Sequence, residues 1–452
     1  MRVLSVFFWI MIFLLPDLKV RAQSLIWLGT LGGREGWAYD VSDNGKVVVG
    51  AARDSSGSVR AFRWTPSGGM QDLGSLGGIL SNAFGVSADG SVIVGKAEIS
   101  AGSWRAFRWV ESGGMTNLGT FENGSFSMAR DVSSDGSAVV GRSDSSYFYM
   151  RAYRWTPLGG FESMGVFEGG NSSWAYAVSS DGSIVVGRAD HGNAESAYRW
   201  TATEGLQAIG TLPGGNNSIA RGISDDGSVI VGISNLDSGP SHAFRWTASG
   251  GMQDLGSLYG GESEAWDASA DGSIVVGFMR NYATADEYAF RWTEEKGMED
   301  LNVTFDSLLG QTGRMSFASA ISPDGRYIVG WGWHQGYNMP FLLDTGTSTG
   351  IRNSSGRSVS LKPELLKNFP NPFNASTTIV FKISEADETK LHIFTLAGRK
   401  VRTLLNKHLS AGVYRICWDG KNGAGRSVAS GIYLYRLTSG RFSASGKMLL
   451  VR

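Results

Sequence analysis

One short phrase returns along most of the chain at a nearly constant interval, and this interval limits what the chain can fold into. The pair Arg-Trp recurs six times, with spacings of 45 or 46 residues between successive tryptophans. These tryptophans are Trp64, Trp109, Trp155, Trp200, Trp246 and Trp292. Self-similarity at this period is typical of a β-propeller, in which each repeat forms one four-stranded blade.

A second marker raises the number of repeats to seven. Six copies of Ser-x-Asp-Gly and one Ser-Asp-Asn-Gly follow the same period, and they end at Gly45, Gly90, Gly136, Gly182, Gly227, Gly272 and Gly325. Asp-Gly and Asn-Gly tolerate positive φ at both central positions of a type I′ turn. We therefore expect a type I′ turn between the first and second strands of every repeat.

The pattern of each repeat predicts four strands. In order, the segments NAFGVS, SVIVG, RAFRW and MQDLGSL exemplify the first to the fourth strand. The second strand is apolar at the consecutive positions Val92, Ile93 and Val94. A sheet with one wet face would alternate, so both faces of this strand are expected to be buried between blades. The repeated tryptophan is then a packing residue. The arginine before it is expected to lie along the blade and pair with a turn aspartate, although a repeated arginine could instead form an anion site.

The two ends of the repeat region complement each other. The last repeat has its turn at Asp324-Gly325 and a third strand near residues 339–344, but it lacks a fourth strand. Residues 25–33 align with the fourth strand of the first repeat, residues 70–78. An N-terminal strand that completes the last blade would close the ring and leave no open edge. The predicted fold is therefore all-β, with a seven-bladed β-propeller over residues 23–345.

The first residues, 1–22, predict a secretory signal peptide. An apolar run from Val6 to Leu15 follows a basic residue, and Ala22 ends a small-residue cleavage site. Pro16 interrupts the run, whereas a transmembrane helix needs roughly 20 apolar residues. We expect an exported protein with no transmembrane span in its mature chain.

Composition argues against several kinds of partner. Lysine plus arginine and aspartate plus glutamate number 41 each, which gives no electrostatic case for a nucleic-acid or membrane-surface partner. The single cysteine, Cys417, cannot form an internal disulfide, so stability must come from burial.

The repeated phrases resemble a known family. The LG-x-LGG, VS-x-DG-x-x-VVG and HAFRW patterns across residues 25–345 are similar to those of the HAF family of extracellular repeats. Only His242 keeps the histidine of the family pattern, and the other repeats carry arginine, serine or tyrosine there. The resemblance implies an extracellular setting and no particular biochemical role.

The last part of the chain differs from the repeats. A Gly/Ser/Thr-rich linker at residues 346–361 precedes residues 362–452, whose alternating apolar strands predict a small Ig-like β-sandwich. Its motifs are, in order, NPFN (371–374), LAG (396–398), AGVY (411–414), WDG (418–420), ASGIY (429–433) and KM (447–448). They resemble the type A sorting domain of the Por (type IX) secretion system. This resemblance implies the type IX machinery as a partner, removal of the domain, and attachment at the cell surface.

No local motif predicts an active site. The five histidines form neither an HExxH pair nor a metal-ligand cluster, and no phosphate-binding loop occurs. The one GxSxG match lies in the linker, outside the strand–turn–helix setting of a nucleophile elbow. We predict no catalytic, metal-binding or cofactor-binding residue, although an active site assembled from several blades stays open as an alternative.

Differences between the repeats identify candidate binding residues. Alanine stands four residues before the turn serine in all seven repeats. The residue directly after this alanine varies, and its side chain is large in six of the repeats. The six large residues are Tyr39, Phe84, Arg130, Tyr176, Arg221 and Trp266. The connections between second and third strands vary most. Aromatic residues on or beside them are Trp104, Tyr147, Tyr149, Trp174, Tyr282, Trp333 and Tyr337.

In a propeller these variable connections share one face, and function resides on loops that a rigid frame carries. Flat aromatic rings can stack on sugar rings, so the first hypothesis is a secreted module that binds a polysaccharide or a surface protein. A polysaccharide-acting hydrolase or lyase is the alternative. A scaffold without a small ligand, and unselected loops whose aromatic residues only fill gaps, are the remaining possibilities.

Overall fold

The computed structural model describes residues 23–346 except 101, 146–148 and 193. In the C-terminal part it describes residues 364–365, 368, 371, 373–374, 376–383, 387–409 and 412–451. The chain divides into two compact units, Met1–Thr349 and Gly350–Arg452. The predicted signal peptide and all but the first residue of the predicted linker lie outside the described residues. No described helix is long and apolar enough to cross a membrane.

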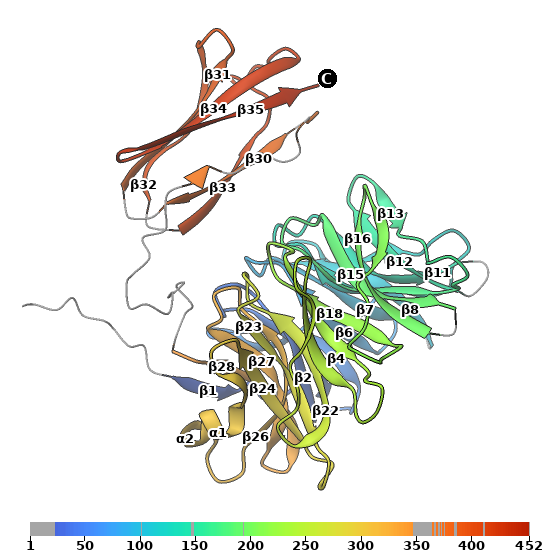
Figure 1. The fold of residues 1–452 in the computed structure, drawn as a ribbon. Helices are drawn as coiled ribbons and strands as arrows, with labels where there is room; N and C mark the ends of the chain where they lie inside the picture. The colour runs from blue at the N-terminus through green and yellow to red at the C-terminus, as the bar shows by residue number, and fades with distance from the viewer. Residues whose placement is uncertain are drawn as a thin grey trace, which may run out of the picture. The chain divides into compact units, whose positions relative to one another are not determined.

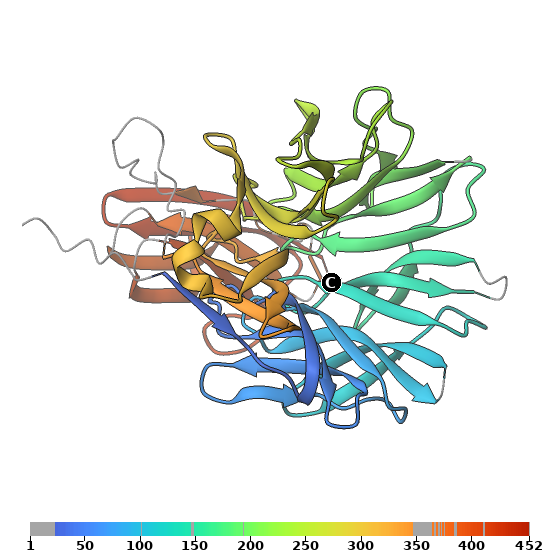
Figure 2. The same ribbon diagram turned by 90° about the horizontal axis from the view of Figure 1, so that it is seen from below.

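The first unit contains seven four-stranded antiparallel sheets that radiate from a common axis (Figures 1 and 2), as the repeats predict. Blade 1 is β2 (Gly32–Val41), β3 (Val48–Asp54), β4 (Val59–Thr65) and β5 (Gly69–Asp72). Blade 2 is β6 (Ser81–Val86), β7 (Val92–Ser100), β8 (Ser103–Val110) and β9 (Gly114–Gly119). Blade 3 is β10 (Ser127–Val132), β11 (Val139–Asp144), β12 (Met150–Thr156) and β13 (Gly160–Ser163).

Blades 4 to 6 continue in the same order. Blade 4 is β14 (Ser173–Val178), β15 (Ile184–His191), β16 (Ala194–Thr201) and β17 (Gly205–Ala208). Blade 5 is β18 (Ser218–Ile223), β19 (Val229–Ser234), β20 (His242–Thr247) and β21 (Gly251–Asp254). Blade 6 is β22 (Gly260–Ala268), β23 (Ile274–Asn281), β24 (Glu287–Thr293) and β25 (Gly297–Asp300).

Blade 7 joins the two ends of the propeller. It consists of β26 (Arg314–Ile321), β27 (Tyr327–His334), β28 (Tyr337–Asp344) and the N-terminal strand β1 (Ser24–Trp27). β1 pairs antiparallel with β28, and Trp27 packs on Phe341 with ring centroids 5.9 Å apart. The predicted closure by an N-terminal strand is confirmed. Two short helices that the sequence analysis did not predict, α1 (Leu301–Thr304) and α2 (Asp306–Leu309), connect blades 6 and 7.

The blades pack face to face through the residues that the pattern predicts. Ile93 and Val94 in β7 are fully buried, so both faces of this second strand are covered. Trp109 is 6% exposed and belongs to one apolar cluster with Ile93 and with Val49 of the preceding blade. The repeated tryptophan thus fills the space between blades.

The predicted type I′ turns are wrong. In blade 2 the glycine of the turn, Gly90, has a φ of 76°, but the aspartate before it has negative φ, and the other six turns also have positive φ only at glycine. Gly90 N–H donates to the carbonyl of Ser87, which closes a different tight turn. The Asp89 carboxylate accepts hydrogen bonds from the Ser87 hydroxyl and from Ser91 N–H. The aspartate therefore acts as a side-chain acceptor, a role that aspartate often has in turns.

The arginine before the tryptophan does not pair with a turn aspartate. Arg154 donates from Nε to the carbonyl oxygen of Gly182, the turn glycine of the next blade, over 2.8 Å. Arg291 instead pairs with Glu299 of its own blade at 2.9 Å. The predicted partner, a turn aspartate, is therefore wrong for these two arginines.

The second unit is a β-sandwich, as predicted. One sheet is β29 (Glu364–Leu365), β30 (Thr377–Ile383) and β33 (Gly412–Trp418). The other is β32 (Lys400–Leu409), β31 (Asp387–Thr395), β34 (Gly431–Ser439) and β35 (Phe442–Leu450). Trp418, Phe381 and Leu391 are fully buried in a core that this unit forms alone.

Candidate functional site

A β-bulge recurs in the innermost strand of every blade, directly after the repeated alanine. In blade 2 the pairing of β6 with β7 shifts between Ala83 and Gly85, so Phe84 is skipped. The same shift occurs at the equivalent position in the other six blades. A bulge bends a strand and redirects the extra side chain. The skipped residue is in each case the variable position that the sequence analysis identified.

The glycine that ends each second-strand motif makes the bulge possible. A Cβ atom at Gly95 would lie 1.9 Å from the carbonyl oxygen of Asn82, and at Gly330 it would lie 1.8 Å from that of Phe317. No side chain fits at such separations. A glycine inside an apolar strand is a known signal for a bulge or a close backbone approach, and the sequence analysis did not use it.

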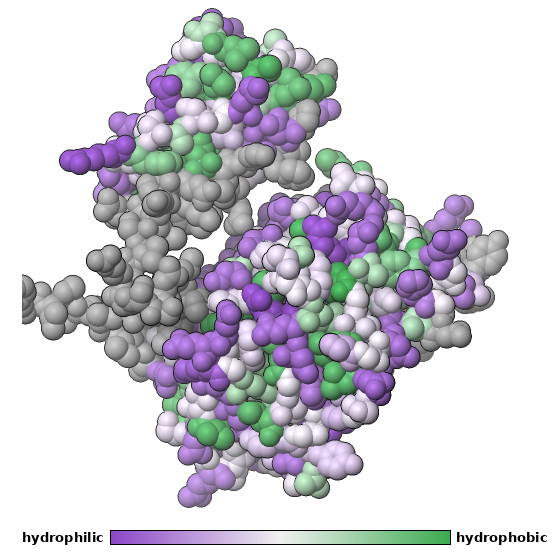
Figure 3. All heavy atoms as spheres, viewed as in Figure 1, coloured by the Kyte–Doolittle hydropathy of each residue, from purple (hydrophilic) through white to green (hydrophobic). Residues whose placement is uncertain are grey.

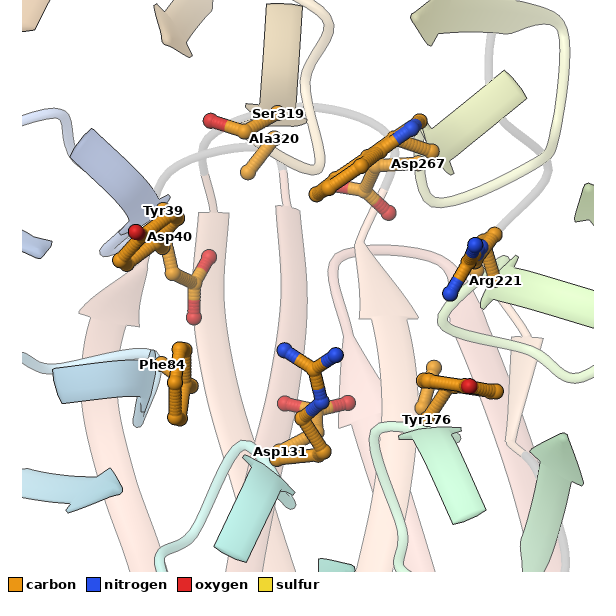
Figure 4. A pocket seen from close by; sticks show the side chains of 13 residues that line it. Tyr39, Asp40, Phe84, Asp131, Tyr176, Arg221, Asp267, Ser319 and Ala320 are labelled. Carbon is orange, nitrogen blue, oxygen red and sulfur yellow. The ribbon is translucent and has the colours of Figure 1, made fainter. Parts of the chain in front are cut away.

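The seven bulge residues surround one cavity of about 130 Å³ on the propeller axis. They are Tyr39, Phe84, Arg130, Tyr176, Arg221, Trp266 and Ser319. Figure 4 shows Tyr39, Phe84, Tyr176 and Arg221 projecting from separate strands toward a common space. Because typical small-molecule pockets measure roughly 300–1,000 Å³, this cavity has room for a substituent of a ligand rather than for a whole ligand.

Two arginines alternate with the aromatic rings around the cavity. The guanidinium carbon of Arg130 lies 4.9 Å from the ring centre of Phe84 and 5.3 Å from that of Tyr176. Arg221 lies 4.7 Å from the same tyrosine ring and pairs with Glu264 at 2.5 Å. Aromatic faces attract cations but do not neutralise them.

Among the described residues, Arg221 has an ion-pair partner and Arg130 has none. The Nε atom of Arg130 is buried, and no described group accepts a hydrogen bond from it. The pKa of Arg130 is lowered to about 10, chiefly by burial and in smaller part by repulsion from Arg221 and Arg142. Since a pKa of about 10 leaves the side chain protonated at neutral pH, Arg130 places a positive charge in the cavity beside flat aromatic faces.

Three aspartates directly follow bulge residues and line the cavity. They are Asp40, Asp131 and Asp267 in blades 1, 3 and 6. The carboxylate of Asp131 accepts one hydrogen bond from Val132 N–H at 2.7 Å and another from Val178 N–H of the next blade at 2.9 Å. The other two aspartates make the same pair of contacts. Each therefore fastens its blade to the following one.

The environment of these carboxyl groups disfavours their charged form. Burial raises the pKa of Asp131 to about 6 and that of Asp267 to about 8. Burial also raises the pKa of Asp40 well above its ordinary value, and repulsion from the other two aspartates adds to the effect. The sequence analysis missed these residues, although aspartate at this position in three of seven repeats was a visible signal.

The opposite end of the channel holds a second cavity of about 100 Å³, which the three aspartates also line. One turn residue, between the serine and the aspartate, donates its backbone N–H to the carbonyl oxygen at the equivalent position of the next blade. An example is the bond from Ala88 to Ser134 at 3.1 Å. The same bond links Ser134 to Ser180 and Ser180 to Asp225. These bonds join successive blades at this end, whereas the variable bulge residues line only the cavity at the other end.

The structure separates the other predicted residues into two groups. Trp104 and Trp174 lie close to basic side chains, with Lys96 4.2 Å from the Trp104 ring centre and Arg188 3.7 Å from that of Trp174. The second group is exposed, does not line the cavity, and belongs to blades 3, 6 and 7. It consists of Tyr149, Tyr282, Trp333 and Tyr337. Tyr147 lies outside the described residues.

Within the described ranges, no three His, Cys, Asp or Glu side chains are grouped so that they could hold a metal ion. The exposed large apolar residues of the propeller are separated along the chain, and in the view of Figure 3 apolar residues form only small patches among polar ones. The cavity on the axis is thus the place where the variable residues of all seven blades converge.

Comparison with known proteins agrees with the two folds. Residues 372–441 match the family of FlgD Ig-like domains. No curated protein matches the sequence.

Among solved structures, an oligogalacturonate lyase from Vibrio parahaemolyticus is 13% identical, with a TM-score of 0.51 over 71% of this chain and 93% of the lyase. TolB from Acinetobacter baumannii is 12% identical with a TM-score of 0.41, over 68% of this chain and 65% of TolB. PorZ of Porphyromonas gingivalis, a surface component of the type-IX secretion system, is 14% identical with a TM-score of 0.39, over 92% of this chain and 57% of PorZ. The chain thus spans about two thirds of TolB. At this level of identity the likeness to the lyase supports the propeller fold alone, and the chain is a seven-bladed β-propeller joined to an Ig-like domain.

Proposed function

We propose that the propeller is an extracellular binding module whose ligand enters the channel above the bulge residues. One observation carries this proposal. Seven blades with nearly the same sequence each direct a variable inner side chain into a single cavity. A ring that served only to pack blades would need no such variety at this position, whereas a binding site needs different groups at different points around the ligand.

The chemistry of the cavity favours a ligand with flat rings and polar substituents. Tyr39, Phe84, Tyr176 and Trp266 surround a space in which one substituent of a sugar ring can lie, and Arg130 provides hydrogen-bond donors. A polysaccharide at the cell surface has both features, and a surface protein is the other class of partner we consider.

Retention of the mature chain, residues 23–452, on a glycan array and on insoluble polysaccharides tests this proposal. We expect retention of the native chain and its loss in Tyr176→Ala. Tyr282→Ala is the matched control, because that tyrosine is 82% exposed and lies outside the cavity. Equal retention of both variants would place binding elsewhere, and no retention on any glycan would contradict binding of a polysaccharide.

Catalysis on a polysaccharide, by a hydrolase or lyase, is the second candidate. Asp131 and Asp267 line the same cavity as Arg130, and their pKa values of about 6 and 8 are near those of general acids and bases that act at neutral pH. Incubating the retained glycans with the protein and measuring new reducing ends or unsaturated products separates the two functions. Binding without product favours the module.

We further propose that residues 362–452 direct export through the type IX secretion machinery and are removed at the cell surface. The motifs from Asn371 to Met448 support this proposal, as does the Ig-like fold that carries them. In a host that has this system, the full chain should reach the cell surface. A chain that ends at residue 361 should stay in the periplasm, and its appearance at the surface in equal amount would contradict the proposal.

A further inference from the structure

Positive charge gathers in one sector of the propeller although the whole chain is neutral. The glycine that ends each second-strand motif is followed directly by a basic residue in three successive blades. These residues are Lys96, Arg142 and Arg188 in blades 2 to 4. The equivalent residues of blades 1, 5, 6 and 7 are Ala51, Ile233, Phe278 and Trp331. Arg130, in the cavity, belongs to the same sector because it lies in blade 3.

Most of these cations lack a carboxylate partner. Arg188 pairs with Glu195, but no ion pair forms at Lys96, Arg130 or Arg142 within the described part of the chain. The Nε atoms of Arg130 and Arg142 are buried and find no described acceptor. A buried polar group without a partner is costly, and a buried charge is costlier. The fold thus holds donors in place for a partner that it does not itself supply.

The cations also repel one another. Burial lowers the pKa of Lys96, and the neighbouring charges of Arg130 and Arg142 lower it further. Burial likewise lowers the pKa of Arg142, and Arg188 adds to the shift. An anion bound among them would relieve both the repulsion and the unsatisfied donors.

Aromatic rings alternate with these cations. Trp174 lies between two of them, with its ring centre 5.5 Å from Arg142 and 3.7 Å from Arg188. The ring of Trp104 lies 4.2 Å from Lys96. Such an alternation fits a chain molecule in which every unit has a flat face and an anionic group.

The depth of the channel limits what kind of anion fits. The cavity of about 130 Å³ is lined by Arg130 and also by Asp40, Asp131 and Asp267. Their charged forms would repel any anion, and a doubly charged phosphate more than a singly charged carboxylate. The chain also lacks the basic excess that steers proteins to nucleic acids. A carboxylate on a sugar ring meets both limits.

We propose that this sector binds an acidic oligosaccharide, with one uronate carboxylate at Arg130 in the cavity, a second at Arg142, and sugar rings beside Trp174 and Trp104. The inference rests on the proposed binding function, since it names the ligand class for that site. Lys96 would contact a further carboxylate of the same chain.

Calorimetric titration of the mature chain tests the proposal. The probes are hexasaccharides of galacturonate, mannuronate and glucuronate type, each beside its carboxyl-reduced neutral counterpart, and a single-stranded DNA. We expect at least one acidic probe to bind tenfold or more tightly than its neutral counterpart, and raising the salt concentration to weaken this binding. Arg130→Gln and Arg142→Gln should each weaken it at least tenfold.

Lys46→Gln is the control, since Lys46 is an exposed cation next to a turn of the opposite face. This variant should bind the acidic probe with the affinity of the native chain. Without ligand, Arg142→Gln should melt no lower than the native chain, because the substitution removes repulsion. This variant also decides the outcome if Arg130→Gln fails to fold.

Three results would overturn the inference. Equal affinity for acidic and neutral probes would reject the anionic ligand while the proposed glycan binding stood. Tighter binding of DNA than of every uronate would reject the sugar. Unchanged affinity in folded Arg142→Gln would reject the sector. If no glycan of either kind binds, both this inference and the proposed glycan binding fail.

Discussion

Asp267 and Asp131 couple the stability of the propeller to pH. Their pKa values in the folded protein, about 8 and about 6, lie above the value of about 3.9 expected for an unfolded chain. The folded state then binds protons more strongly than the unfolded state, so the free energy of unfolding falls as pH rises through these values. Ionising these carboxyl groups in the folded protein lowers the free energy of unfolding. This loss is absent below about pH 4 and reaches its full size above the pKa of the folded state.

We therefore expect the melting temperature to fall between pH 5 and pH 9. Asp267→Asn should reduce this fall, even though the amide loses one of the two acceptors and lowers the melting temperature at pH 5. Asp237→Asn, at an exposed position of blade 5, serves as the control and should keep the native slope. Thermal melts monitored by circular dichroism give the comparison, and identical slopes for all three proteins would contradict the assignment.

Gly95 tests the backbone geometry behind the candidate site. A Cβ there would lie 1.9 Å from a carbonyl oxygen and 2.8 Å from the Phe107 ring, so Gly95→Ala forces the bulge to move. We expect a loss of about 2–3 kcal/mol in the free energy of unfolding, as for overpacked cores. Gly113→Ala is the matched control because its Cβ meets only a side-chain methyl at 3.4 Å. Denaturant titration measures both, and equal losses would mean that the close approach does not constrain this position.

At the scale of the strand, β1 carries the closure of the ring. Leu25 and Trp27 pack against the core of blade 7, and Leu28 is only 7% exposed, whereas Ile26 is 43% exposed and contributes little. Burying one large apolar side chain is worth roughly 1.5–3 kcal/mol, so the three inward residues together approach the roughly 5–15 kcal/mol net stability of a typical protein.

Deleting residues 23–31 should therefore leave a propeller that aggregates or melts far below the intact one. The loss has two sources, the apolar burial and the newly unpaired edge of β28. Differential scanning calorimetry with light scattering measures both effects. A truncated protein that melts like the intact one would show that β1 is dispensable for closure.

The two units have separate cores, which leads to a prediction for the whole molecule. The apolar cluster of the sandwich contains only residues from Leu365 onward, and no cluster of the propeller includes any of them. Removing residues 362–452 should leave the melting temperature of the propeller nearly unchanged. A shift of more than a few degrees in calorimetry would indicate that the sandwich stabilises the propeller.

The sequence predicted the features that repeat and missed those that depend on a neighbouring blade. The 45–46-residue period and the N-terminal match to MQDLGSLGG were enough for seven blades and their closure. The turn type was wrong because Asp-Gly fits more than one tight turn, and the hydrogen bonds that Asp89 accepts from Ser87 and Ser91 select the one observed.

The candidate site was predictable in part for the same reason. The ring from Tyr39 to Trp266 was visible because its members occupy one position of the repeat. The link from Asp131 to Val178 was not, since its partner lies 47 residues away in another blade. The gathering of cations in blades 2 to 4 likewise emerges only when the repeats are placed around an axis.

The pairing of β1 with β28 sets an order of events during biogenesis. Ser24 lies opposite Asp344, 320 residues later in the chain (344 minus 24). At about 5–20 residues per second, synthesis of that interval takes roughly 15–60 s. Throughout this time the first strand has no partner and the newest blade has an open edge. The growing chain thus depends on whatever shields it, and the ring becomes resistant to proteases and to aggregation only when its last hairpin arrives.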